Sequence, residues 1–122
     1  MTVPIDNTAA VLRQRFGAWM KAKREEAGLT QLELCIELDY SQPAMVSQVE
    51  RGSSALPEVD LSLWADLLRI GREEFAQTYL YYIRPFVWEA MHGKDPFKAE
   101  KLPRPAKTIK PRPVKGDLKR VK

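Results

Sequence analysis

Residues 41–52, SQPAMVSQVERG, carry short polar side chains at helical spacing. Val46 and Val49 lie three residues apart, so they share one face of a helix, which we expect to pack inward. A glutamine amide and a serine hydroxyl each donate and accept hydrogen bonds, and no acid accompanies them on the outer face. That face can therefore hydrogen-bond a partner edge that presents both donors and acceptors. Its members include Ala44, Ser47, Gln48 and Arg51.

Two predicted helices precede this segment. Apolar residues at helical spacing predict a first helix over residues 8–27, which Gly28 ends. Thr30 and Glu33 form a capping box at the start of a second helix, which runs through Leu38.

The remaining predicted helices follow at short intervals. Pro43 fits only the first turn of the third helix, which ends near Gly52. Apolar spacing predicts a fourth helix from Pro57 and a fifth over residues 72–84. Pro85 should bend or break the fifth helix, and a short sixth helix over residues 86–91 is predicted after it.

The stretches AGLTQLELCIELDYSQ, VSQVERG and LWADLL together resemble the phage repressor and Cro-like helix-turn-helix family, also called the xenobiotic-response-element type. The resemblance covers residues 8–83. It implies an all-α fold, with a five-helix lambda-repressor-like DNA-binding domain, a C-terminal helical extension and a basic Pro-rich tail. The chain departs from the family by one extra residue before Glu50, which we place near residues 40–42.

Composition divides the chain into three expected parts. Residues 1–71 are expected to form the helix-turn-helix domain, and residues 72–93 a helical dimerisation segment. Five of the nine prolines lie in residues 94–122, which hold few large apolar residues, so we expect a flexible tail there. That tail has eleven Lys or Arg residues and three acids, a balance of +8, whereas residues 1–93 carry −4.

The family resemblance implies a sequence-specific transcriptional regulator, a dimeric repressor that reads a palindromic operator in double-stranded DNA with the helix at residues 42–51. Glutamine suits the edge of adenine, and a small apolar side chain suits a thymine methyl group. The expected base contacts are Gln42, Pro43, Ala44, Met45, Ser47 and Gln48. The expected phosphate contacts are Thr30, Gln31, Arg51, Ser53, Arg13 and Arg15.

Two further sets of contacts are expected. The resemblance pairs Arg24 with Glu50 in a structural ion pair between helices. The stretch from Phe75 to Met91 is too rich in apolar residues for one face of a monomer to bury, which predicts a homodimer interface. The alternative is that it packs on the first helix. The interface set is Phe75, Tyr79, Tyr82, Phe86, Val87, Trp88 and Met91.

Catalysis and metal binding are not expected. His92 is the only histidine and Cys35 the only cysteine, which is too few for an ordinary zinc site, and Cys35 should be buried. We therefore expect no enzyme, no metal and no cofactor. No run of eighteen apolar residues or secretory signal occurs, so we expect no membrane contact and a cytoplasmic, nucleoid-associated protein.

The acidic balance of residues 1–93 keeps other functions open. One alternative is an antitoxin-type protein whose C-terminal part binds a protein partner. Another is an adaptor whose helix-turn-helix contacts protein alone. The basic tail has three interpretations: it follows the DNA backbone or a minor groove, it solubilises the chain, or it docks on a protein or RNA partner.

Overall fold

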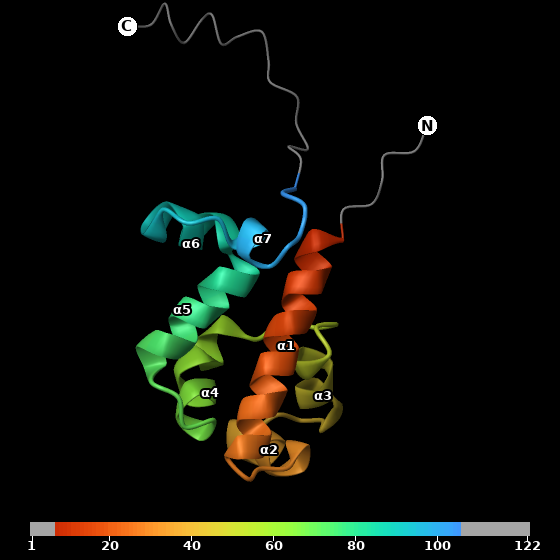
Figure 1. The fold of residues 1–122 in the computed structure, drawn as a ribbon. Helices are drawn as coiled ribbons and strands as arrows, with labels where there is room; N and C mark the ends of the chain where they lie inside the picture. The colour runs from red at the N-terminus through yellow and green to blue at the C-terminus, as the bar shows by residue number, and fades with distance from the viewer. Residues whose placement is uncertain (1–6, 106–122) are drawn as a thin grey trace, which may run out of the picture.

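The computed structural model describes residues 7–105, and within that range the chain is all-α, as predicted (Figure 1). None of these helices has the length and apolar character needed to cross a bilayer. Helix α1 runs through the middle of the fold, with α3 on one side and α4 and α5 on the other. The elements are α1 (Thr8–Glu26), α2 (Gln31–Leu38), α3 (Ala44–Glu50), the 3-10 helix η1 (Glu58–Asp60), α4 (Leu61–Leu67), α5 (Arg72–Ile83), α6 (Pro85–His92) and α7 (Pro96–Ala99).

The predicted helix ends around α2 are confirmed at atomic detail. Gly28 has φ of 77°, a left-handed value that suits glycine and turns the chain after α1. The Glu33 N–H donates to Thr30 Oγ1 at 3.0 Å, and the Thr30 N–H donates to Glu33 Oε1 at 2.8 Å. This capping box fixes the direction in which α2 leaves the turn.

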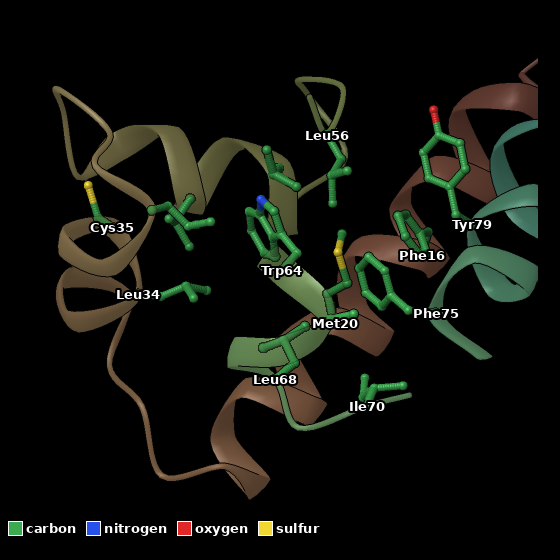
Figure 2. Close-up of a cluster of buried hydrophobic side chains, with 14 residues drawn as sticks. Phe16, Met20, Leu34, Cys35, Leu56, Trp64, Leu68, Ile70, Phe75 and Tyr79 are labelled. Carbon is green, nitrogen blue, oxygen red and sulfur yellow. The ribbon is translucent and has the colours of Figure 1, made fainter. Parts of the chain in front are cut away.

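The core is an aromatic and aliphatic cluster to which all five helices from α1 to α5 contribute (Figure 2). Phe16 of α1 packs against three rings of α5, with centroid distances of 5.9 Å to Phe75, 5.8 Å to Tyr79 and 6.0 Å to Tyr82. Phe75 and Tyr79 are buried within the monomer, so the dimer interface predicted at these two residues is wrong. Helix α5 instead packs on the first helix, which was the alternative. The Phe16 and Trp19 rings of α1 are apolar too, so the two helices bury each other's aromatic side chains.

The chain beyond Gly93 also differs from its prediction as a flexible tail. Asp95 caps α7 by accepting hydrogen bonds from the backbone N–H groups of Phe97 and Lys98. The Phe97 ring is 1% exposed and lies 5.1 Å from the Phe86 ring, centroid to centroid. One aromatic side chain thus anchors a segment whose average composition predicts no order, and residues 106–122 of the expected tail lie outside the described residues.

Polar contacts tie this segment, residues 95–105, to the start of the fold. The Thr8 hydroxyl donates to the Pro103 carbonyl oxygen at 3.2 Å, across 95 positions of the chain. Arg15 donates to both the carbonyl and the carboxylate oxygen of Glu100, at 2.8 and 2.9 Å. The segment therefore closes over the N-terminal half of α1.

Two glycines allow α3 to lie directly against α1. A Cβ atom on Gly17 of α1 would stand 2.2 Å from the Glu50 carbonyl oxygen, and one on Gly52 would stand 2.8 Å from the Gln14 backbone. Gly52 also has φ of 77°. Because rigid backbone occupies both spaces, no side chain fits at either position without moving a helix.

We predict that Gly17→Ala lowers the free energy of unfolding by about 3 kcal/mol, the upper part of the usual overpacking range, because the new methyl group would overlap the Glu50 carbonyl. Urea unfolding followed by circular dichroism measures this. Gly71→Ala is the matched control, since its Cβ would meet nothing within 4 Å. Equal midpoints for the two variants would contradict the close approach.

We also predict that Phe97→Ala lowers the free energy of unfolding by about 3 kcal/mol, as for other buried phenylalanines. The same urea titration measures this loss. Val59→Ala, at a side chain that is 91% exposed, should cost much less. A Phe97→Ala variant as stable as the parent would restore the flexible-tail interpretation.

Candidate functional site

The candidate site is the pair α2 and α3 with the turn between them. Asp39 ends α2 in the left-handed region, with φ of 59°, and α3 begins at Ala44 with Pro43 at the capping position. No side chain caps α3, although both Ser41 and Gln42 lie in the turn. The turn between α2 and α3 therefore spans residues 39–43.

Two side chains, the buried Cys35 and the half-buried Tyr40, hold this turn in place. The Cys35 thiol lies 3.4 Å from the carbonyl oxygens of Tyr40 and Gln42, within donor range of either. The Tyr40 hydroxyl donates to Asp60 at 2.9 Å and accepts from the Trp64 indole N–H at 3.0 Å. Burial, chiefly, raises the pKa of the Tyr40 phenol to about 12, so it stays a neutral donor at physiological pH.

Helix α3 divides into an inner and an outer face as the valine spacing predicts. Val46 and Val49 are buried in the core. The six predicted base-contact residues are Gln42 and Pro43, which precede α3, and four residues of α3 itself. Of these, Gln42, Pro43 and Ala44 are exposed, and Met45, Ser47 and Gln48 are half-buried.

Local contacts orient the outer side chains of α3 and the loop after it. The Arg51 guanidinium donates to the Ser47 hydroxyl, one helical turn away. Ser53 and Ser54 both bond to Gln48, the first at its backbone oxygen (3.1 Å) and the second at its side-chain oxygen (3.4 Å). The structure thus brings Ser47, Gln48, Arg51 and Ser53 together on one surface.

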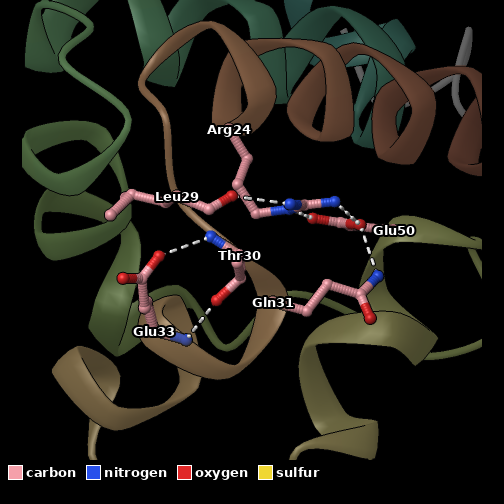
Figure 3. Close-up of polar contacts among 6 residues, drawn as sticks. All are labelled: Arg24, Leu29, Thr30, Gln31, Glu33 and Glu50. Carbon is pink, nitrogen blue, oxygen red and sulfur yellow. Dashed lines mark hydrogen bonds and ion pairs between the residues drawn. The ribbon is translucent and has the colours of Figure 1, made fainter.

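The expected ion pair between Arg24 and Glu50 is present and joins α1 to the end of α3 (Figure 3). Arg24 Nε donates to Glu50 Oε2 at 2.6 Å, and its Nη2 donates to Oε1 at 3.2 Å. Arg24 Nη1 donates to the Leu29 carbonyl at 2.7 Å, and Gln31 Nε2 donates to Glu50 Oε1 at 2.8 Å. Four hydrogen bonds therefore offset the cost of burying two charges.

This pairing decides the electrostatics of the outer face. Glu50 is the only acid in residues 40–57, and its side chain is buried against a guanidinium. The exposed side chains of that segment include no carboxylate, while Arg51 adds a positive charge. The face is neutral to positive although residues 1–93 as a whole carry −4.

The remaining predicted phosphate residues divide into two groups. Arg13 borders the α3 end of the fold, because its Nε donates to the Gly52 carbonyl at 2.9 Å. Thr30 and Gln31 stand at the start of α2, where one caps the helix and the other bonds Glu50. Arg15 is different: its ion pair with Glu100 turns it toward the C-terminal segment instead of α3, so the structure does not group it with the others.

Sequence reasoning missed residues that position α3. Gly17 was not singled out, although a glycine inside a predicted helix is a signal of close backbone approach. The Tyr40–Asp60 bond joins residues 20 apart in the chain and has no local signal. Of the residues predicted for the dimer interface, three on α6 remain at the surface: Phe86, Val87 and Met91 are 50%, 48% and 56% exposed. Tyr82 and Trp88 are half-buried.

Comparisons of the chain with family models, with curated proteins and with solved structures found no match.

We predict that Glu50→Ala lowers the free energy of unfolding by about 3–5 kcal/mol, because it leaves the Arg24 guanidinium buried without its carboxylate. Chemical unfolding at constant m-value measures the loss. Asp66→Ala is the matched control, since it breaks the solvent-exposed pair with Arg72 and should leave stability nearly unchanged. A similar effect of the two substitutions would show that the Arg24–Glu50 pair is not a structural link.

Proposed function

We propose that the protein binds double-stranded DNA sequence-specifically, with α1–α5 as a repressor-like helix-turn-helix domain and α3 in the major groove. The observation that carries this proposal is the outer face of α3: it has amide, hydroxyl and small apolar side chains, and Glu50, the one acid of residues 40–57, is buried. An α-helix fits the major groove, and amide side chains can pair with adenine there.

The surroundings of α3 supply groups for phosphates. Arg51 and Ser53 follow the helix, Arg13 lies beside Gly52, and the N-terminus of α2 presents backbone donors near Gln31. Phosphate contacts fix register and base contacts supply sequence preference. Arg15 is not part of this proposal, because its guanidinium forms an ion pair with Glu100.

The proposal includes a homodimer on a palindromic site. Phe86, Val87 and Met91 on α6 are the exposed apolar residues that support it, after the burial of Phe75 and Tyr79. A second copy would cover this surface and present two α3 helices to successive turns of the groove. An inverted repeat in the preferred DNA is the expected sign of that symmetry.

Selection of bound duplexes from a random pool tests the function. We predict an enriched inverted repeat, and we predict that Gln48→Ala or Gln42→Ala weakens binding to it by about 1–3 kcal/mol, the usual value of one bidentate base contact. Binding to unrelated duplexes should be unaffected by either substitution. Fluorescence anisotropy at a fixed salt concentration measures both affinities.

Gln77→Ala is the control, because Gln77 lies on α5 and bonds His92. It should leave the affinity for the selected site unchanged. Recovery of no preferred sequence, or equal losses with all three glutamine variants, would contradict DNA reading by α3 and favour a helix pair that binds protein.

A further inference from the structure

A cavity of about 300 Å³ lies between the start of α1, the junction of α5 and α6, and the C-terminal segment. Its walls are mostly apolar, from Leu12, Ile83, Phe86 and Phe97 among others, with Arg13 and Tyr82 as its polar members. This volume stands at the lower end of the range for small-molecule sites. At about 30 Å³ for each water-sized group, it holds roughly ten non-hydrogen atoms.

Arg13 gives this cavity a charge preference. Its Nε donates to the Gly52 carbonyl, and within residues 7–105 no carboxylate pairs with its guanidinium. The residue is half-buried, so solvent screens its charge less than that of an exposed arginine. A planar guanidinium binds a carboxylate with geometric specificity. An apolar cavity with one such group fits an anion that has an apolar body.

We propose that this cavity binds a small amphipathic carboxylate, with its apolar body against Leu12, Ile83 and Phe97 and its carboxylate on Arg13. The same arginine bonds the loop at Gly52, directly after α3. A bound carboxylate therefore acts on α3 through one side chain. The ligand site does not depend on the proposed function. A regulatory effect of the ligand on DNA binding does rest on the proposed function.

Titration of the full-length, ¹⁵N-labelled protein with phenylacetate tests the site without DNA. Phenylacetate has ten non-hydrogen atoms, and phenylacetamide is its uncharged match in size. We expect phenylacetate to shift the Arg13 Nε–H resonance and the backbone resonances of Leu12, Ile83 and Gly52, with at least tenfold tighter binding than phenylacetamide. No shift at ~10 mM ligand, where a fragment of this size should bind, or equal affinity for the two compounds, overturns the proposal.

Two variants locate the ligand. Ala9→Phe places a ring in the cavity and should weaken phenylacetate binding at least tenfold, whereas Ala22→Phe, on an exposed position of α1 that does not line the cavity, should have no effect. Arg13→Gln should reduce the preference for phenylacetate over phenylacetamide to near unity. Unchanged binding in Ala9→Phe, or an unchanged preference in Arg13→Gln, overturns the assignment.

The DNA experiment separates the two proposals. If phenylacetate binds and no preferred duplex is recovered, the ligand site stands and the proposed function fails. If a duplex is recovered and phenylacetate does not bind, the reverse holds. If both bind, saturating phenylacetate should change the affinity for the selected duplex, and Ala9→Phe should abolish that change.

Discussion

The seating of α3 on α1 is the constraint on which the candidate site depends. Three contacts on one face of α1 produce it: the Arg13 bond to the Gly52 carbonyl, the close approach at Gly17, and the Arg24–Glu50 pair. A hydrogen bond, a steric fit and an ion pair together fix both the height and the rotation of a helix of only seven residues. A helix that short has little stability of its own, so its orientation is a tertiary property.

The ion pair has a second effect besides position. A carboxylate at the end of α3 would repel an anionic partner if it faced solvent, but here it faces a guanidinium in the interior. The surface charge near α3 is therefore set by which acids are buried, and the overall balance of the chain is a poor guide to it. Arg13 borders both this surface and the cavity, which is why one residue enters both proposals.

Local chemistry made much of the fold predictable. The capping box at Thr30, the left-handed glycine at residue 28 and the proline at residue 85 each act within a few residues, so sequence spacing locates them. Valine spacing in α3 gave its inner face for the same reason. Such signals define where helices begin and end and which side of each is apolar.

Long-range pairing was not predictable in the same way. An apolar stripe shows that α5 must pack against another element, but it does not identify that element. In the structure Phe75 and Tyr79 pack against Phe16 of α1. Average composition did not reveal the order of residues 95–105. Burial of the single Phe97 ring stabilises this segment in spite of its several prolines. The pairing of Arg15 with Glu100 had no local signal either, because the two residues lie 85 positions apart.

The Thr8–Pro103 contact has a consequence for synthesis of the protein on the ribosome. The first turn of α1 cannot receive its final cover until a further 95 residues have been made. At typical elongation rates that interval is roughly 5–20 s, far longer than a helix needs to form. During it the start of α1 lacks the cover that residues 95–105 provide, and transiently exposed surface of this kind makes a nascent chain prone to aggregation until the covering segment packs.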